Sequence, residues 1–552
     1  MSCPPPSGPD PRPCPGPGPG RLPGSSQGIP QGSAEDPDQD PDRDPATQGP
    51  ATQDPEALLR ALARLAPEVA GRLAPPSADG AVTSAPTGDP GGSGDPATSA
   101  APDHDPAARR RLAVALDERR ARVAVLGQGY VGLPLAARLA RAGFELTGLD
   151  DDPARCAAIT AGAPVLGAGS EALAAELADL AVAGRYRATT DPAVLAECDV
   201  AVVCVPTPLA PDRTPDLAHV RAAGLALGAH LPAGALAVLE STTYPGTTRG
   251  AFRDALVDGR RAAGCATEPL DVFLAYSPER EDPGRDRDEQ ARCPKLVGGT
   301  DAAAEDLALR LYRAAFPEVV PTDGAEVAEA AKLFENVFRA VNIALVNEAK
   351  TVLDAMGIDV WRVLDAAATK PFGFMPFRPG PGMGGHCIPI DPFYFAWAGE
   401  QHGVRARFVE LAGEVNRAMP AWVARRLEDE LERRGRVLFG ARVLVLGLAY
   451  KPDVADTRES PALDLVDRLL LAGAAVTTVD PHVARVATPG GAELEPAPLT
   501  AEALDAADAV LVVTDHRDLD WPLVAERARL AVDTRGVLRA FARTMGERLV
   551  LA

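Results

Sequence analysis

The stretch GPGMGGHCIPIDPFY, residues 380–394, places a single cysteine, Cys387, within a run of glycine and proline. Glycine and proline at this density break both helical and strand periodicity, so the thiol is not there mainly to fill a core. His386 precedes it, and Asp391 follows four residues later. The segment is therefore either a tight structural turn or a loop that presents a thiol.

Three other segments carry polar residues that could take part in chemistry. The segment ESTTYPGTT, 240–248, follows an apolar strand, and Thr242 there could hold a water or serve only as a turn residue. Glu279, in AYSPERE, follows another strand, and its carboxylate could move a proton or position water. Lys332 and Asn336 lie one turn apart on a predicted helix and point the same way, although a lysine there often only snorkels to solvent.

A thiol beside a nicotinamide site would support a four-electron oxidation. One hydride leaves an alcohol to give an aldehyde, the thiolate adds to it, a second hydride leaves, and the thioester is hydrolysed. In this scheme Cys387 carries the acyl group, while Lys332 and Asn336 stabilise the oxyanion. Glu279 and Asp391 handle protons and water. Without the thiol, only a two-electron oxidation would be expected.

The elements that would position the cofactor begin at residue 121, where short apolar strands alternate with helical patterns and predict a doubly wound parallel sheet. Gly127, Gly129 and Gly132 form G-x-G-x-x-G between a strand and a helix, where the backbone can bind pyrophosphate. Asp150 ends the next strand, the usual place of a carboxylate that bonds ribose hydroxyls and repels a 2′-phosphate. The pattern favours NAD over NADP. Asp151 is the alternative to Asp150, because predicted strand ends are uncertain by a residue or two.

The whole chain is predicted to be α/β, with two Rossmann-like doubly wound domains joined by a long central helix and a helical spacer. Residues 1–105, rich in Pro, Gly and Asp, lack apolar periodicity and are predicted to be disordered, with one short amphipathic segment at 55–74. We expect an NAD-binding Rossmann domain over 120–324, a central helical dimerisation domain over 325–430, and a second α/β domain over 437–552.

The second α/β segment lacks a dinucleotide fingerprint and has only Gly447 before LAYKPDVADTRES. Lys451 and Arg458 in this longer loop suit a mononucleotide or a sugar-nucleotide diphosphate better than a second dinucleotide. Solvated charges in a surface loop are the alternative.

Composition excludes several classes of protein. A net charge of −21 argues against nucleic acid or an anionic membrane as the main partner. No apolar run approaches the roughly 20 residues that span a bilayer. Eight cysteines without a C-x-x-C pair fit a reducing cytoplasm, with neither a metal site nor a disulfide framework. We therefore expect a soluble cytoplasmic protein that binds a small ligand.

Seven motifs, taken together and in this order, resemble those of the UDP-glucose/GDP-mannose dehydrogenase family: GQGYVGLP, CVPTP, ESTTYPGTT, SPERE, AKLFEN, GPGMGGHCIPID and GLAYKPDVADTRESPA. These nucleotide-sugar dehydrogenases oxidise the C6 alcohol of a UDP- or GDP-sugar to a uronate with two NAD. The resemblance implies that the catalytic cysteine is Cys387 and its partner aspartate Asp391. The remaining catalytic positions fall on Lys332, Asn336, Thr242 and Glu279.

The patterns and the resemblance together assign binding residues. Those for NAD are Gly127, Gly129, Tyr130, Val131, Gly132, Asp150, Pro206, Thr207 and Arg458. Those for the UDP-sugar are Arg378, Gly384, Gly385 and Lys451. In such enzymes the C-terminal domain holds UDP and the central helices make the dimer, so the resemblance implies a homodimer or a higher homo-oligomer.

The expected sugar follows from finer agreement. The cysteine loop reads G-G-H-C-I-P-I-D, similar to the branch that acts on N-acetylated UDP-hexosamines, and Ile390 stands where the glucose branch carries Lys. ATKPFGFMPF and YSPERED resemble the UDP-N-acetylglucosamine 6-dehydrogenases of that branch. Arg378 departs from the aromatic residue usual in this subgroup, and its guanidinium could bind diphosphate or a carboxylate. We expect UDP-N-acetylglucosamine, with UDP-N-acetylmannosamine and UDP-glucose as alternatives.

Two other classes of protein remain open at this point. A two-electron dehydrogenase of the 6-phosphogluconate or hydroxyisobutyrate type would share the first sheet, but it would need neither the Cys387 loop nor a second α/β domain. A non-catalytic sugar-nucleotide binding protein would keep the fold without turnover. The number of NADH formed per sugar separates the first from a four-electron enzyme, and a turnover assay separates the second.

Overall fold

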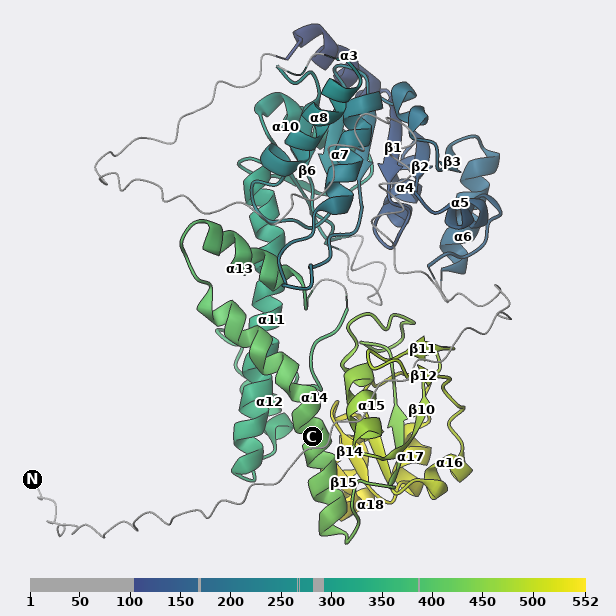
Figure 1. Cartoon of the computed structure of the whole chain (residues 1–552), viewed down its shortest axis with the longest axis vertical. Coiled ribbons are helices and arrows are strands. Elements are labelled where there is room, and N and C mark those ends of the chain that lie inside the picture. The colour runs from purple at the N-terminus through teal and green to yellow at the C-terminus, as the bar shows by residue number, and fades with distance from the viewer. Residues whose placement is uncertain (1–103, 167–169, 266, 268, 281–291, 386–387) are drawn as a thin grey trace, which may run out of the picture. The chain divides into compact units, whose positions relative to one another are not determined.

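The computed structural model describes residues 104–552, apart from 167–169, 266, 268, 281–291 and 386–387 (Figure 1). Residues 1–103, and with them nearly all of the tail predicted to be disordered, lie outside the described residues. The predicted nucleophile Cys387 lies outside them as well.

The first α/β half is built on an eight-stranded sheet of order β3-β2-β1-β4-β5-β6-β7-β8. Neighbouring strands pair in parallel except β6 and β7, which are antiparallel. The order reverses between β1 and β4, the place where open α/β sheets bind ligands. The strands are β1 (Arg122–Leu126), β2 (Glu145–Leu149), β3 (Tyr186–Thr189), β4 (Val200–Val203), β5 (Leu236–Leu239), β6 (Phe273–Tyr276), β7 (Lys295–Gly299) and β8 (Val319–Pro321).

Helices cover both faces of this sheet because its central strands are apolar throughout. The strand sequences VAVV of β4 and LAVL of β5 are buried at every residue. Two apolar clusters, one containing Leu133 and Leu307 and the other Val220 and Leu256, form the core. The helices are α3 (Pro106–Asp117), α4 (Gly132–Arg141), α5 (Pro153–Thr160), α6 (Glu171–Val182), α7 (Ala218–His230), α8 (Arg253–Ala262) and α10 (Ala302–Arg313), with short turns η1 (Pro192–Glu197) and η2 (Thr248–Phe252).

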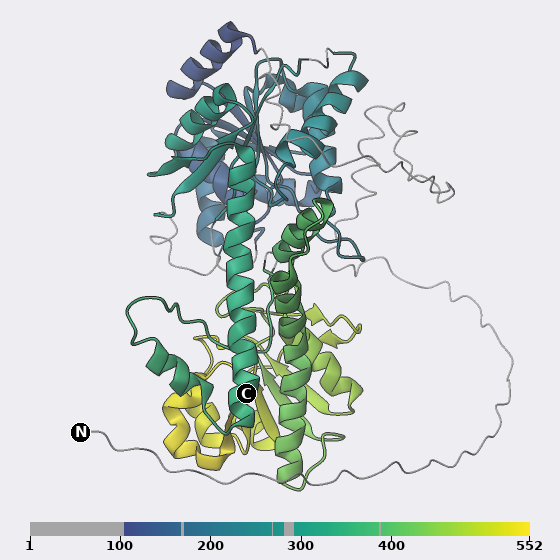
Figure 2. The same cartoon turned by 90° about the vertical axis from the view of Figure 1, so that its left-hand side faces the viewer.

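A helical segment follows, and its longest member is α11 (Ala325–Ala355), with 31 residues. The other helices are α12 (Val360–Ala367), α13 (Asp391–Gln401) and α14 (Arg407–Arg433). Helices α11 and α14 run side by side and pack against each other (Figure 2). The predicted long central helix is thus confirmed, and its apolar residues divide between a face buried on its neighbours and an exposed face.

The second α/β half has a five-stranded parallel sheet of order β10-β9-β13-β14-β15. Its order reverses between β9 and β13, as in flavodoxin-like sheets. The strands are β9 (Arg442–Leu446), β10 (Ala475–Val479), β13 (Ala509–Val512), β14 (Ala531–Asp533) and β15 (Leu549–Leu551), with a hairpin of β11 (Val486–Ala487) and β12 (Glu493–Leu494). The helices are α15 (Pro461–Leu471), α16 (Ala501–Ala506), α17 (Trp521–Arg527) and α18 (Ala542–Met545), with turns η3 (Val537–Phe541) and η4 (Gly546–Arg548).

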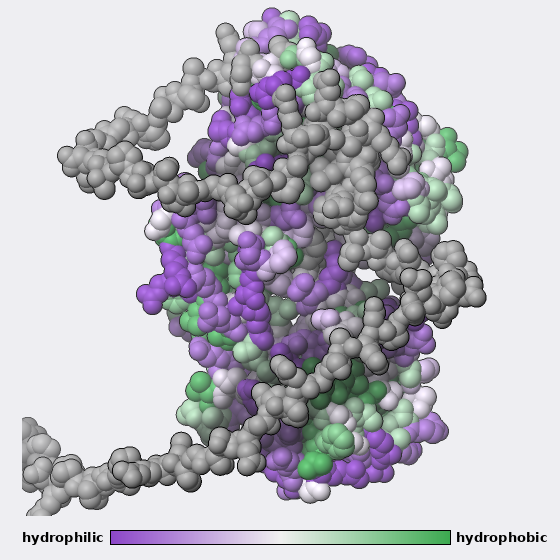
Figure 3. All heavy atoms as spheres, viewed as in Figure 1, coloured by the Kyte–Doolittle hydropathy of each residue, from purple (hydrophilic) through white to green (hydrophobic). Residues whose placement is uncertain are grey.

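The predicted fold class is confirmed: the chain is α/β, with two doubly wound sheets joined through a long central helix. The surface in Figure 3 shows hydrophilic residues interspersed with hydrophobic ones. Among the described residues, no helix combines the length and hydropathy needed to cross a bilayer.

Candidate active site

The loop after β1 forms a turn that depends on glycine at two of its three fingerprint positions. Gly127 has a φ of +88°, and a Cβ atom there would lie 2.4 Å from the carbonyl oxygen of Cys204. A Cβ at Gly132 would lie 1.8 Å from the oxygen of Gly127. At Gly129, in contrast, a Cβ would meet no protein atom within 4 Å. The chain packs around two glycines and leaves space beside the third, which fits a cradle for the NAD pyrophosphate at the start of α4.

Asp150 follows β2 directly and touches this turn. Its Oδ2 accepts the N–H of Gln128 at 2.7 Å, and its Oδ1 accepts the N–H of Asp152 at 3.0 Å. Arg155 Nη1 lies 3.2 Å from Oδ2. The alternative, Asp151, is exposed. The geometry therefore favours Asp150 as the acceptor for ribose hydroxyls.

The loop after β4 lies across the switch point from the turn and contains the predicted cofactor residues Pro206 and Thr207. Thr207 is buried, and Pro206 is half-buried. Tyr394 of α13 donates its hydroxyl to the carbonyl oxygen of Pro208 at 2.9 Å. This bond ties the loop to the helix that begins with Asp391.

Three of the predicted catalytic residues come together where α11 meets the start of α13. Lys332 and Asn336 are buried on α11, and Asn336 Nδ2 donates to Asp391 Oδ2 at 2.5 Å. Burial raises the pKa of Asp391 to about 6, although the charge of Lys332 and the bond from Asn336 oppose the rise. A carboxyl with that pKa can hold or release a proton near neutral pH, next to a buried ammonium.

The Thr242 loop is attached to the same helix by Glu329, a residue that sequence reasoning missed. The buried Glu329 carboxylate accepts the N–H groups of Gly246 at 2.6 Å and Thr248 at 2.8 Å, and the Thr248 hydroxyl at 2.7 Å. Burial raises the pKa of Glu329 to about 7, and these bonds oppose the rise. Glu329 precedes Lys332 by three residues on the helix, a spacing that places both on one face and could have identified it.

Glu279 lies just after β6 and is connected to α11 through its neighbour. Its Oε1 accepts the N–H of Arg280 at 2.6 Å, and its Oε2 lies 3.2 Å from Nζ of Lys295. Arg280 pairs with Glu335 of α11 at 2.7 Å. Glu335 directly precedes Asn336, so this ion pair holds the SPER segment against the part of α11 that carries the predicted oxyanion residues.

The cysteine loop is described up to Gly385 and again from residue 388, so the sites of His386 and Cys387 themselves are outside the described residues. Asn347 Oδ1 of α11 accepts the N–H of Gly380 at 2.9 Å, and the N–H of Gly385 donates to the carbonyl oxygen of Arg458 at 2.9 Å. A Cβ at Gly384 or at Gly385 would lie 2.6 or 2.7 Å from Tyr450. Packing against the second α/β half therefore accounts for glycine at both predicted substrate positions.

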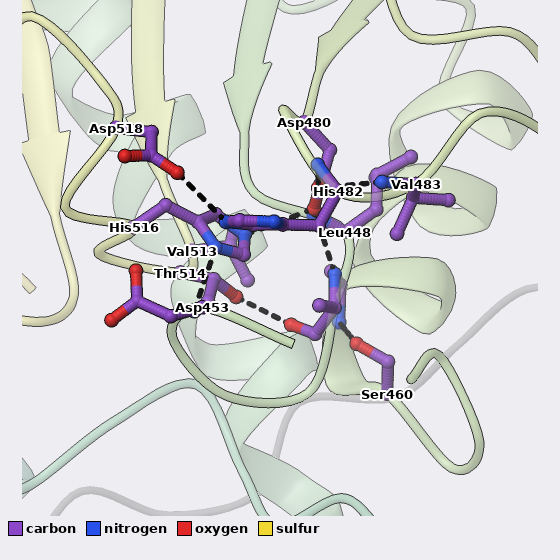
Figure 4. Close-up of polar contacts among 12 residues, drawn as sticks. Leu448, Asp453, Ser460, Asp480, His482, Val483, Val513, Thr514, His516 and Asp518 are labelled. Carbon is purple, nitrogen blue, oxygen red and sulfur yellow. Dashed lines mark hydrogen bonds and ion pairs between the residues drawn. The ribbon is translucent and has the colours of Figure 1, made fainter. Parts of the chain in front are cut away.

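The loop after β9 is held by one carboxylate at the second switch point (Figure 4). Asp480, directly after β10, accepts a hydrogen bond from the imidazole Nε2 of His516 at 3.0 Å. Its two oxygens also accept four backbone N–H groups at 2.6 to 3.0 Å, from Leu448, Ala449, His482 and Val483. Burial opposes ionisation, but the bonds from His516 and the backbone lower the pKa of Asp480 to about 2.

His516 links Asp480 to the loop that carries Lys451 through hydrogen bonds at both of its ring nitrogens. Its Nδ1 accepts the N–H of Asp453 at 3.0 Å, so Nε2 carries the proton that faces Asp480. His482, His516 and Asp453 are close enough to be considered as ligands of a cation. However, both ring nitrogens of His516 are engaged, and the Asp453 carboxylate pairs with Arg517 at 2.6 Å. The cluster is therefore better explained as a scaffold for the loop.

Two of the three predicted binding cations, Lys451 and Arg458, lie in the loop after β9 and face different aromatic rings. Arg458 pairs with Asp456 at 2.7 Å, and its guanidinium lies 4.9 Å from the ring centroid of Tyr130, so it reaches the predicted cofactor turn. Lys451 stays in the loop after β9, with Nζ 5.5 Å from the Tyr450 ring.

The contacts of Arg378 are with residues of α12 and do not place it beside Lys332, Asn336 or Asp391. It is exposed, lies 3.5 Å from Asp365, and stacks 5.6 Å from the ring of Trp361 on α12. Arg535, which no motif had indicated, follows β14 and lies against the cysteine loop instead. Its Nε donates to Val513 O at 2.7 Å, and a Cβ at Gly380 would be 2.7 Å from its Nη1.

Comparison with known proteins places these elements in context. Three family models match consecutive parts of the chain: the NAD binding domain of the UDP-glucose/GDP-mannose dehydrogenase family at residues 121–316, its central domain at 326–418 and its UDP binding domain at 444–540.

Among curated proteins, the chain is 33% identical over 425 residues to a UDP-N-acetyl-D-mannosamine dehydrogenase of Pyrococcus horikoshii, a match that covers 76% of this chain and 96% of that protein. It is 34% identical over 367 residues to a UDP-N-acetyl-D-glucosamine 6-dehydrogenase of Pseudomonas aeruginosa, covering 66% and 83%. Among solved structures, an NDP-N-acetyl-D-galactosaminuronic acid dehydrogenase from Methanosarcina mazei Go1 matches with a TM-score of 0.66 at 30% identity, covering 80% of this chain and 97% of that one.

Proposed function

Because the chain belongs to the UDP-glucose/GDP-mannose dehydrogenase family and is an NAD-dependent nucleotide-sugar dehydrogenase, we propose that it oxidises the C6 alcohol of a UDP-N-acetylhexosamine to the uronic acid, with UDP-N-acetylglucosamine preferred. The observation that carries the proposal is the buried group of Lys332, Asn336 and Asp391 beside the loop that contains Cys387. Cys387 precedes Asp391 by four residues in the sequence, and a dehydrogenase that removed only two electrons would not need a thiol there.

Each residue of the group has a chemical task in the proposed reaction. Bound NAD supplies the hydride acceptor. Cys387 Sγ bonds to the C6 carbon after the first oxidation, and the second oxidation leaves a thioester that water hydrolyses. Lys332 and Asn336 donate hydrogen bonds to the oxygen that gains charge at C6.

Proton and water handling falls to Asp391, Glu279 and Thr242. Asp391, with a pKa of about 6, is suited to exchange a proton with the reacting oxygen. Glu279 and Thr242 lie on separate loops that α11 fastens through Glu335 and Glu329. We propose that these two residues orient the water that cleaves the thioester.

The preference for UDP-N-acetylglucosamine rests on the sequences ATKPFGFMPF and YSPERED, because relatives of nearly equal identity are named for different N-acetylated sugars. Arg378 follows ATKPFGFMPF directly and departs from the aromatic residue that is usual in this subgroup. Its guanidinium pairs with Asp365 and lies over the ring of Trp361. Its guanidinium therefore need not contact the sugar, which supports the assignment.

We also propose that the chain forms a homodimer through α11. Large apolar side chains recur on this helix at steps of four and seven residues, a spacing that places them on one stripe. All are more than 40% exposed in the single chain: Val327, Phe334, Phe338, Leu345, Val352 and Met356. A second copy would bury this stripe, and size-exclusion chromatography with light scattering tests it.

The deciding experiment measures NADH formed per sugar with UDP-N-acetylglucosamine, UDP-N-acetylmannosamine and UDP-glucose. We expect two equivalents, with the first sugar turned over most efficiently. One equivalent would refute the thioester route, and a preference for another sugar would overturn the subtype. Cys387→Ser should not form uronate, whereas uronate formed at the parental rate would remove the thiol from the mechanism.

Lys332→Ala should lower kcat by about 10²–10³, the size of losing an oxyanion donor. The matched control is Lys350→Ala on the same helix, where Nζ lies 3.3 Å from Asp354 and donates to Leu551 O. It should lower stability and change kcat much less. An unchanged kcat in Lys332→Ala would return that lysine to a structural role.

A further inference from the structure

A buried ion cluster lies behind Glu279 and has no part in the reaction as proposed so far. Lys295 Nζ lies 3.0 Å from Glu240 Oε2 and 3.2 Å from Glu279 Oε2. The side chains of Lys295 and Glu240 are 3% and 0% exposed, whereas that of Glu279 is 18% exposed. Tyr312 of α10 donates its hydroxyl to the other oxygen of Glu240. One ammonium is thus shared by two carboxylates that follow neighbouring strands, β5 and β6.

The charges in this cluster do not balance. Burial by itself would lower the pKa of Lys295, but the two adjacent carboxylates outweigh it and raise the pKa above that of a free lysine, so the ammonium persists. Burial raises the pKa of Glu240 to about 7, although Lys295 opposes the rise. A proton taken up by the cluster near neutral pH therefore goes to the fully buried Glu240.

The other titratable groups around the cluster do not change this assignment. Cys204, after β4, and Tyr312 are buried, and burial raises the pKa of each well above its ordinary value, so both stay neutral. Among the described residues, Arg280 is another charged neighbour of Glu279, and it pairs with Glu335. Of these groups, Glu240 is therefore the one that takes up a proton near neutral pH.

We propose that Lys295 is a positioning residue that fixes the carboxylate of Glu279 and keeps it ionised, with Glu240 as the second ligand of the ammonium. The inference rests on the proposed function, because it assumes that Glu279 handles water or protons in the reaction. Lys295 holds one oxygen of Glu279 while the backbone N–H of Arg280 holds the other. With both oxygens held, the carboxylate has a single orientation.

The test compares the pH profile of kcat for the parent, Lys295→Met and Lys295→Arg. Removing the ammonium should raise the pKa of Glu279, so the acid limb of the Lys295→Met profile should move up by at least about one pH unit. Lys295→Arg keeps the charge and should restore the limb to the parental position. KM for NAD should change less than twofold, because the cofactor turn is not touched.

The matched control is Lys350→Met, which removes another buried lysine from a carboxylate partner remote from Glu279. It should lower thermal stability without moving the acid limb. If Lys295→Met lowers kcat equally at all pH values, the lysine only ties the strands together and the proposal is wrong.

Glu240→Gln provides a second variant if Lys295→Met fails to fold. It leaves the ammonium to Glu279 alone, so the acid limb should stay at the parental position or move to lower pH, and a limb that moves to higher pH would contradict the proposal. Failure of the proposed function would look different, because the parent itself would then not produce two NADH per sugar.

Discussion

The two α/β halves use the same turn after their first strand, but they complete it differently. Gly127 and Gly447 have φ values of +88° and +90°, and each donates its N–H at 2.8 Å to the last residue of the neighbouring strand. In each half an aspartate follows that neighbouring strand and accepts N–H groups from the turn. These aspartates are Asp150 in the first half and Asp480 in the second.

The difference lies in how many donors each carboxylate already has. Asp150 receives two backbone N–H groups and one guanidinium, whereas Asp480 receives four backbone N–H groups and the His516 imidazole. A carboxylate offers about four lone-pair sites, so Asp480 has none left for a ligand hydroxyl. The same position in one fold is therefore open to the predicted ribose contact in one half and serves as a loop scaffold in the other.

The turns also differ at their third residue, which is Gly129 in the first half and the buried Ala449 in the second. Gly129→Val should raise KM for NAD about 100-fold, because the new side chain would fill the space expected for the pyrophosphate. Thermal stability should be unchanged, since a Cβ there meets no protein atom within 4 Å. A parental KM would show that NAD does not approach this residue, and a sugar KM that changed equally would point to a general defect.

Asp480→Ala should raise KM for the UDP-sugar by roughly 10- to 30-fold and leave KM for NAD unchanged, because it releases the loop that carries Lys451 from Asp480 and His516. Leaving several buried N–H groups without an acceptor should also cost about 3 kcal/mol of unfolding free energy. Asp505→Asn, at an exposed carboxylate of the same half, is the control. An equal loss of NAD binding would mean that the two halves do not divide the ligands as proposed.

Asp150→Ala should shift the ratio of kcat/KM for NAD to that for NADP by about tenfold toward NADP. The substitution removes the carboxylate that repels a 2′-phosphate and frees Arg155, which lies 3.2 Å from it, to attract one. An unchanged ratio would move the ribose assignment to Asp151.

The smallest effect is a pH dependence of stability that belongs to the second half. The pKa of Asp480 is about 2 in the folded chain, below the roughly 3.9 of an unfolded aspartate. The contribution of ionised Asp480 to the free energy of unfolding is therefore complete above about pH 4 and is lost as the pH falls through 2. The stability gap between the parent and Asp480→Asn should narrow by about 1 kcal/mol between pH 6 and pH 3, measured by urea unfolding. A constant gap would mean that the carboxylate is not the source of the stability.

The sequence was sufficient for the features with a fixed local spacing. The alternation of apolar strands and helices predicted both sheets, and the long helical pattern predicted α11. The spacing of Gly127, Gly129 and Gly132 predicted a tight turn after β1. Its absence after β9 agrees with the family model of the second half, which is a UDP binding domain.

What the sequence could not provide are contacts between distant segments. Glu329 and Lys295 look like ordinary charged residues, because their partners lie 83 and 55 residues away in the chain. The two glycines that follow Met383 were predicted to bind substrate, and nothing in the sequence indicated that a Cβ at either would lie within 2.7 Å of Tyr450, which the folded chain brings near.

Helix α11 has a consequence for how this protein can change over time. Along its 31 residues it contacts the Thr242 loop through Glu329, Asp391 through Asn336, the cysteine loop through Asn347 and the last strand through Lys350. One inserted residue within the helix would turn everything after it by about 100° and advance it by 1.5 Å. The loops of either sheet can lengthen or shorten independently, but an insertion or deletion in this helix would misalign several contacts at once. Length changes among descendants of this chain should therefore accumulate outside α11.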